Sequence, residues 1–120
     1  MALPDYPVTS GMADELRRRA CKLALAVTAA TLTITIAHRG RRLFFTNAST
    51  INVTVPSGLP VDFECELIQK GAGQIVVAAG AGAQVDSYSG WKKSLGQQAQ
   101  MVLAMSDEAD KLWLGGDITA

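Results

Sequence analysis

The sequence predicts a mainly β protein, a small antiparallel β-sandwich or jelly-roll-like barrel with an N-terminal arm and a short helix. Residues 50–83 hold three runs in which apolar and polar side chains alternate, the period expected of half-buried strands. Turn-forming residues separate these runs at 56–60, 71–73 and 80–82. No alternation of helix and strand patterns follows residue 30, so a doubly wound α/β sheet is not expected.

The first thirty residues differ from the rest. Residues 1–11 carry two prolines and predict an extended arm that orders only against another surface. A helix is expected over residues 12–25, because apolar side chains recur there at helical spacing: Leu16, Ala20, Leu23 and Val27. β-branched residues after position 27 predict its end. The expected organisation is therefore an arm and helix over residues 1–30 and a β-sandwich domain over residues 31–120.

The β domain is expected to contain about eight short strands. Further strands are predicted at residues 43–46 and 84–87, and a final hairpin from 99–105 and 111–114. The two Gly-Ala-Gly segments predict tight hairpin turns, because glycine adopts the positive φ that such turns require. Four sets of side chains are expected to face the core: Leu32, Ile34 and Ile36; Ile51, Val53 and Val55; Val61, Phe63, Cys65 and Leu67; Ile75, Val77 and Ala79.

Composition restricts the partners of the chain. Of 120 residues, 11 are Lys or Arg and 11 are Asp or Glu, so the global basicity of a phosphate-binding protein is absent and no nucleic-acid partner is expected. The apolar stretch at 22–30 is too short to span a bilayer and has no short basic leader before it, so neither a membrane partner nor a targeting signal is expected. Few charged residues and many apolar ones favour self-association.

Nothing in the sequence predicts catalysis. His38 is the single histidine, expected to be exposed in a turn, with no nucleophile or metal ligands at a recognised spacing. The Gly-Ala-Gly segments join strands and precede no helix, which disfavours a phosphate-binding loop. Cys21 and Cys65 lie in no CxxC pattern and are expected to be reduced. We therefore expect no enzyme activity, no metal and no cofactor.

Two kinds of exposed side chain are candidates for binding. Basic clusters occur at Arg39, Arg41 and Arg42 and at Arg17, Arg18, Arg19 and Lys22. They favour either docking onto an acidic protein surface or two solvated faces whose long stems cover apolar surface. Aromatic residues offer either a sugar-binding groove or ordinary packing: Phe63, Tyr88, Trp91 and Trp113. The carboxylates Asp62, Glu64 and Glu66 are expected to face outward on one strand and to discourage strand aggregation.

Several motifs carry a resemblance to a known family. They are Asn47-Ala48-Ser49, Thr54-Val55-Pro56, Leu59-Pro60 shortly before Phe63, residues 68–74 (Ile-Gln-Lys-Gly-Ala-Gly-Gln), Lys93 with Gln97 or Gln98, and residues 112–117 (Leu-Trp-Leu-Gly-Gly-Asp). Over residues 31–119 the chain resembles a β domain recurrent in virion proteins of tailed bacteriophages. That domain is non-enzymatic and occurs in tail fibres, head fibres and capsid-surface proteins. The basic segment 39–42 departs from the family pattern, and residues 1–30 lie outside it.

The resemblance implies a capsid decoration (cement) protein, made in the host cytoplasm and located on the capsid surface of the virion. It is expected to bind the major capsid protein and to form a homotrimer. The expected capsid contacts are Tyr6, Leu16, Arg17, Arg18, Arg19 and Lys22. The expected oligomer or binding surface comprises Arg39, Arg41, Arg42, Tyr88 and Trp91. The alternative is a tail-fibre or head-fibre domain that recognises host surface glycans through Tyr88 and Trp91.

Overall fold

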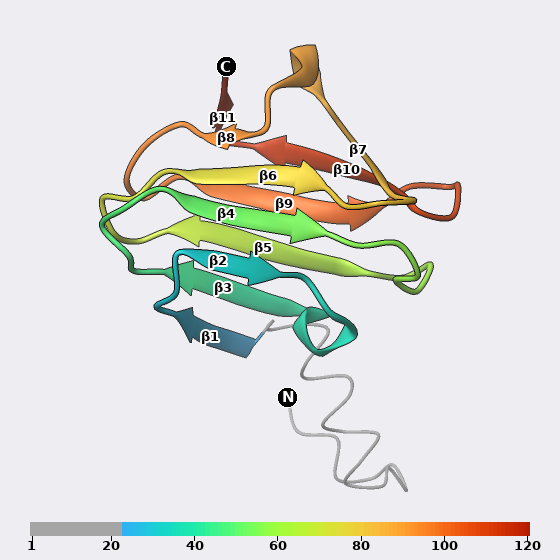
Figure 1. The fold of residues 1–120 in the computed structure, drawn as a ribbon, viewed down its shortest axis with the longest axis horizontal. Coiled ribbons are helices and arrows are strands. Elements are labelled where there is room, and N and C mark those ends of the chain that lie inside the picture. The colour runs from blue at the N-terminus through green and yellow to red at the C-terminus, as the bar shows by residue number, and fades with distance from the viewer. Residues whose placement is uncertain (1–22) are drawn as a thin grey trace, which may run out of the picture.

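Residues 23–120 are described by a computed structural model, in which they form two β-sheets (Figure 1). Sheet A has six strands in the order β1-β3-β5-β9-β10-β7, and sheet B has five in the order β11-β8-β6-β4-β2. The elements, including two short 3-10 helices, are β1 (Leu23–Val27), β2 (Thr31–Thr33), η1 (Ile36–His38), β3 (Arg41–Phe45), β4 (Ile51–Val55), β5 (Glu64–Gln69), β6 (Ile75–Ala79), β7 (Gln84–Ser87), η2 (Tyr88–Gly90), β8 (Lys93–Ser94), β9 (Gln100–Met105), β10 (Lys111–Gly116) and β11 (Ile118–Thr119).

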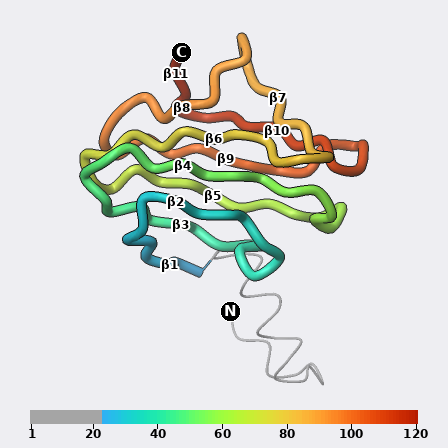
Figure 2. Tube along the Cα trace, viewed as in Figure 1, coloured from blue at the N-terminus to red at the C-terminus, as the bar shows by residue number. Residues whose placement is uncertain are grey.

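The first half of this fold is solenoid-like, because the chain changes sheet after every strand. β1, β3 and β5 are parallel neighbours in sheet A, and β2, β4 and β6 are parallel neighbours in sheet B. Figure 1 shows β1, β3 and β5 running in the direction opposite to β2, β4 and β6, and the colour of the tube trace follows the same alternating course (Figure 2). One coil takes 24 residues between Leu43 and Leu67 and between Val53 and Val77, and 18 between Leu25 and Leu43.

The second half is mostly antiparallel. β9 pairs antiparallel with β5 and forms a hairpin with β10, so the predicted final hairpin is confirmed. β8 lies antiparallel to both β6 and β11. β7 closes sheet A as an edge strand, parallel to β10. The later strands thus pair antiparallel with the last strands of the coil in both sheets, β9 with β5 and β8 with β6.

The predicted mainly β class is confirmed, but the predicted connectivity is wrong. β1 to β6 are parallel within their sheets, and the arrangement is solenoid-like rather than an antiparallel β-sandwich or a jelly-roll-like barrel. The physical reason is that side chains alternate with period two in parallel and antiparallel strands alike. The alternation therefore identified strands without identifying their neighbours.

The Gly-Ala-Gly segment at 71–73 is not a hairpin turn. It carries the chain from β5 in sheet A to β6 in sheet B and stacks on the turn that joins β3 to β4. Gly73 N–H donates to Asn47 O over 3.0 Å, and a Cβ atom on Gly73 would overlap the carbonyl oxygen of Ser49. A Cβ atom on Gly71 would likewise overlap the backbone of Thr46. Glycine is needed there for close approach of two backbones, and the segment at 80–82 also joins strands of different sheets.

The core lies between the sheets and contains most of the predicted inward side chains. Ile51, Val53 and Val55 of β4 are at most 1% exposed. The alternation fails where strands end sooner than predicted: Ile36 lies in η1 and is 61% exposed, and Val61 precedes β5 and is 82% exposed. Ala79, at the end of β6, is also exposed. The buried apolar side chains are Val27, Ile34, Leu43, Phe45, Ile51, Val53, Val55, Phe63, Cys65, Leu67, Ile68, Ile75, Val77, Val85, Ala99, Met101, Leu103, Leu112 and Leu114.

The helix predicted over residues 12–25 is wrong at its C-terminal end. Residues Leu23–Val27 form strand β1, which pairs with β3 and aligns Leu25 with Leu43. These five residues alternate Leu and Ala, a pattern that satisfies a strand as well as a helix, and pairing with β3 decides between them. β1 therefore joins the β fold although it lies in the segment expected to be arm and helix. The remaining residues of that segment up to 22, including Cys21, lie outside the described residues.

The stacking of the two turns predicts that position 73 requires glycine. Gly73→Ala is expected to lower the free energy of unfolding by about 3 kcal/mol, because the new methyl group must push two turns apart. Gly96→Ala is the matched control, since a Cβ atom there meets nothing within 4 Å. That variant should change stability by no more than about 1 kcal/mol. Urea unfolding of the two variants measures both values, and equal stability would contradict the stacking.

Candidate functional site

The predicted site residues do not form one site. All six expected capsid contacts, Tyr6, Leu16, Arg17, Arg18, Arg19 and Lys22, lie outside the described residues. The other five divide between two ends of sheet A. Arg41 and Arg42 lie on β3, next to the edge strand β1, with Arg39 just before β3, whereas Tyr88 and Trp91 follow β7, the opposite edge strand. The predicted oligomer or binding surface is therefore two separate surfaces.

The basic surface near β3 is partly neutralised. Arg39 lies 3.4 Å from a carboxylate oxygen of Asp62, and Arg42 Nε lies 3.8 Å from Glu66 Oε1. The Arg42 guanidinium also stands over the Phe44 ring, 5.5 Å from its centroid. Within residues 23–120, Arg41 forms no ion pair. Because Arg39 and Arg42 already have carboxylate partners, Arg41 is the member of this group best able to attract an acidic partner.

His38 is buried, which corrects the prediction that it is exposed in a turn. It is the last residue of η1, and its Nδ1 atom accepts a hydrogen bond from Thr35 N–H over 2.9 Å. Thr35 Oγ1 in turn accepts from Ala37 N–H over 3.3 Å, so the two side chains cap the turn together. Burial, and secondarily the nearby positive charge of Arg41, lower the pKa of His38. This cap is hard to recognise in a sequence, because the capping box that starts a helix usually has Glu or Gln, and not His, at its third position.

The aromatic surface is built on an exposed loop. Tyr88 and Trp91 face each other edge to face, with ring centroids 5.5 Å apart and planes at 79°. Tyr88 is 74% exposed, and η2 stands away from the sheets in the ribbon view (Figure 1). Ser89 has a φ of 54°, a left-handed conformation that a non-glycine residue seldom adopts. This backbone holds the exposed Tyr88 ring against the half-buried Trp91 ring, an arrangement able to contact a ligand or a protein.

Trp113, a candidate for the sugar-binding groove that was not included in the predicted binding surface, is exposed. Trp113 is 56% exposed on the outer face of β10, opposite Asp86 of β7 and Ala104 of β9. Val102 on the same face of sheet A is 37% exposed. The sequence could have indicated the exposure of Trp113, because successive side chains of a strand alternate between its two faces. Trp113 lies between Leu112 and Leu114, which are both buried. Phe63 is buried, so the four candidate aromatic residues form no common sugar-binding groove.

Residues 68–74 meet strand β8 at a buried corner between the sheets. Ser94 Oγ of β8 donates to Gln69 Oε1 of β5 over 2.5 Å and accepts from Ile75 N–H of β6 over 2.8 Å. Gln74 Nε2 donates to Ser94 O over 2.9 Å. These bonds satisfy buried polar groups and join sheet A to sheet B. Gln69 and Gln74 of the segment 68–74 therefore have a structural role at this corner.

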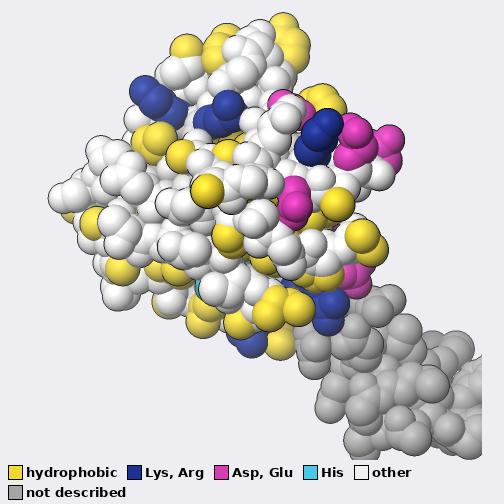
Figure 3. All heavy atoms as spheres, turned by 45° about the vertical axis from the view of Figure 1, so that its right-hand side comes forward, with side chains coloured by type: hydrophobic (Ala, Val, Ile, Leu, Met, Phe, Trp, Pro, Cys, Tyr) yellow, Lys and Arg dark blue, Asp and Glu magenta, His cyan; other side chains and the backbone are white. Residues whose placement is uncertain are grey.

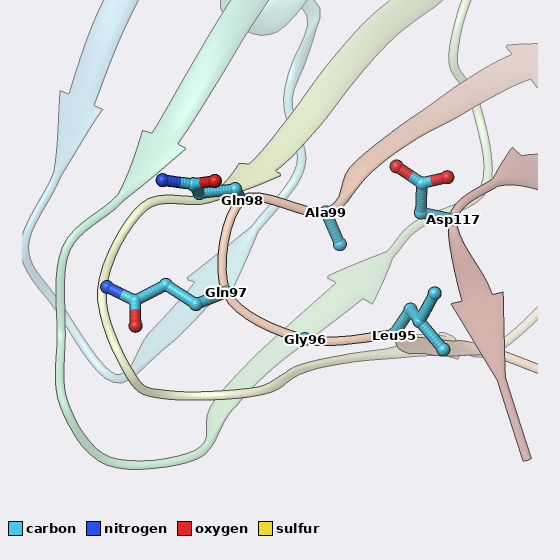
Figure 4. A pocket seen from close by; sticks show the side chains of 6 residues that line it. All are labelled: Leu95, Gly96, Gln97, Gln98, Ala99 and Asp117. Carbon is cyan, nitrogen blue, oxygen red and sulfur yellow. The ribbon is translucent and has the colours of Figure 1, made fainter.

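A hollow of about 250 Å³ lies beside this corner, lined by residues 95–99 and Asp117 (Figure 4). Its polar groups are already used. Asp117 Oδ2 accepts from Gln100 N–H over 3.0 Å, and Gln97 Nε2 donates to Lys70 O over 3.0 Å. Figure 4 shows the Gln97 and Gln98 side chains pointing away from Leu95 and Asp117. The hollow therefore offers few groups to orient a ligand.

The described chain contains no cluster of three or more His, Cys, Asp or Glu side chains able to hold a metal ion. Cys65 is buried in the core as a free thiol. No helix among residues 23–120 is long and apolar enough to cross a bilayer. No protein-family model matches the sequence, and no curated protein matches it. The expected absence of catalysis, metal and cofactor stays a prediction.

His38 predicts a pH dependence of stability. Its pKa is below 6.5 in the folded protein and near 6.5 in the unfolded chain, so the unfolded chain binds the proton more tightly. Stability should be complete above about pH 6.5 and should fall as the pH decreases from there toward the folded pKa. Urea unfolding at pH 7.5 and 5.5 measures the loss. His38→Gln should remove most of this difference, and a stability that increases on acidification would contradict the burial of His38.

Proposed function

We propose that the chain is a non-enzymatic bacteriophage structural protein, a capsid decoration (cement) protein that binds the major capsid protein and stabilises the head. The observation that carries this proposal is where the family motifs lie. Three of these motifs are in contact although they lie far apart in the sequence: Gly73 N–H donates to Asn47 O, and Gln97 Nε2 donates to Lys70 O. The contacts between segments 47–49, 68–74 and Gln97 give these three motifs a common structural role, and this shared role supports the proposal.

The proposed docking uses charge and repetition. Arg17, Arg18, Arg19 and Lys22, with Tyr6 and Leu16, would contact the capsid, and the half-buried Arg41 would add a positive charge from the β domain. Several copies, three by the resemblance, would associate through their β domains. On a shell that repeats the same site many times, weak contacts of each copy add up through multivalency.

The chain is expected to decorate heads in hundreds of copies, countable by quantitative mass spectrometry of purified particles. Simultaneous Arg17→Glu, Arg18→Glu and Arg19→Glu should weaken binding to undecorated heads at least tenfold, because each reversal opposes an acidic surface. Lys92→Glu with Lys93→Glu is the matched control and should bind as the wild type does. A handful of copies per particle, or equal binding by both variants, would contradict the docking.

The second candidate is a tail-fibre or head-fibre domain that recognises host surface glycans. The observation that favours it is the pair formed by the exposed Tyr88 and the half-buried Trp91, held edge to face on a projecting loop. Aromatic rings present apolar faces together with polar edges, which suits the mixed surface of a sugar ring.

For the glycan-binding candidate, Tyr88→Ala and Trp91→Ala should each reduce binding to host cells at least tenfold, whereas Trp113→Ala should not. Flow cytometry with the labelled protein measures the binding. Undiminished binding by both loop variants would remove this candidate, and labelled protein confined to the particle tail would favour it over decoration of the head.

A further inference from the structure

The outer face of sheet B carries two ordered rows of side chains. Alternate residues of β4 face the core, since Ile51, Val53 and Val55 are buried, so the residues between them face outward. The parallel registers of β2, β4 and β6, which lie side by side in Figure 1, align the outward side chains across the strands. One row contains Thr31, Asn52 and Val76, and the other contains Thr33, Thr54 and Ala78.

The aromatic pair stands at the edge of this face. Lys93 of β8 lies opposite Val76 of β6 and extends the first row. The segment before Lys93 still runs beside β6, because Lys92 O accepts a backbone hydrogen bond from that strand over 2.9 Å. Trp91 has extended backbone angles (φ −72°, ψ 131°), so its side chain points to the same side of the sheet as that of Lys93. Tyr88 packs edge to face against Trp91. The face therefore ends in a cation and two aromatic rings.

The polar side chains of this face have no partners within the described residues. Those of Thr31, Thr33, Asn52 and Thr54 form no hydrogen bond there, and three of the four are exposed. Hydroxyl and amide groups both donate and accept hydrogen bonds. Apolar side chains of β6 stand beside them. Sugar rings present a matching mixture, because hydroxyl groups surround the ring and C–H groups cover its two faces, on which aromatic rings stack. The face is thus chemically suited to a carbohydrate.

The charge on this face is positive. Among the outward side chains of the described strands of sheet B, Lys93 is the one charged group, and it forms no ion pair within residues 23–120. The outer face of sheet A, by contrast, carries Glu64, Glu66 and Asp86. Figure 3 shows the acidic side chains of the visible surface on its right-hand half and none on the broad area to their left. An anionic ligand therefore meets an attractive charge on sheet B and no carboxylate.

The dimensions of the face favour an extended chain of sugars over other ligands. Neighbouring strands lie about 4.8 Å apart, close to the length of one sugar residue in an extended polysaccharide, and β8 to β2 span about 14 Å. Protein interfaces have cores rich in Tyr, Trp, Phe and Met, and the outward positions of β2, β4 and β6 hold none of these. A nucleic acid needs several phosphate contacts, whereas this face supplies one lysine.

We propose that the outer face of sheet B, with Tyr88 and Trp91 at its edge, binds an extended, negatively charged polysaccharide that lies across β8, β6, β4 and β2. Trp91 stacks on one sugar ring, Lys93 pairs with an acidic group, and Asn52 and the threonines bond hydroxyl groups further along the chain. The inference rests on the second candidate function, glycan recognition, and adds the binding face and the charge of the glycan. It does not depend on capsid docking.

Binding of the full chain to a printed array of purified bacterial polysaccharides, some neutral and some carrying carboxylate or phosphate groups, tests the proposal. The protein should bind acidic members at least tenfold more tightly than neutral ones, and Lys93→Gln should remove most of that preference. Asn52→Glu should weaken binding to acidic members at least tenfold, because it places a like charge in the middle of the face. Val102→Glu, at an exposed position on the outer face of sheet A, is the matched control and should bind as the wild type does.

Three results would overturn the proposal. One is an absence of binding to every acidic polysaccharide on the array. Another is equal binding by Asn52→Glu and Val102→Glu, with unchanged urea unfolding showing that both variants remain folded. If Trp91→Ala loses binding in that case, the glycan-binding candidate stands and only the assignment of the face fails. The third is a self-associated wild type that Asn52→Glu converts into monomers in light scattering, because a second copy would then cover the face.

Discussion

The contact between backbones at 71–73 and 46–49 is the constraint on which the remaining structure depends. Two turns can lie this close only because Gly71 and Gly73 have no side chains. Their stacking fixes the spacing of successive coils and places Leu43 beside Leu67 and Val53 beside Val77. Since a slip of one residue would turn every side chain to the opposite face, this register keeps the apolar sets of both sheets directed at each other.

The polar corner reinforces the same end of the fold. Gln69, Ser94 and the N–H of Ile75 are hydrogen-bonded where water is excluded, so each needs the others in place. The bonds join strands β5, β6 and β8 and thereby connect the parallel half to the antiparallel half. Asp117 continues the arrangement by accepting from Gln100 N–H at the start of β9. Gln69, Ser94 and Asp117 are thus explained by their structural roles.

Much of the fold could be predicted from the sequence, but its connectivity could not. Alternation identified β4 and the inward faces of β5 and β6, because burial of one strand face leaves a period of two in the chain. The same period appears in parallel and antiparallel sheets, so glycines that permit close stacking were taken as hairpin turns. β1 was missed because its Leu and Ala residues also fit a helix. The residues near β3 and η2 were predicted to form one surface. They lie on two surfaces instead, because their separation depends on the order of the strands in sheet A.

The protein is a coil whose open end and exposed loops are available for contacts, whereas packed side chains fill its interior. Its central claim is that the chain crosses between sheets at residues 71–73. Backbone nuclear Overhauser effects test this most directly. The account predicts contacts of Val53 with Val77 and of Leu43 with Leu67, as parallel neighbours in their sheets. A ladder of antiparallel contacts joining β5 to β6 across residues 71–73 would contradict it.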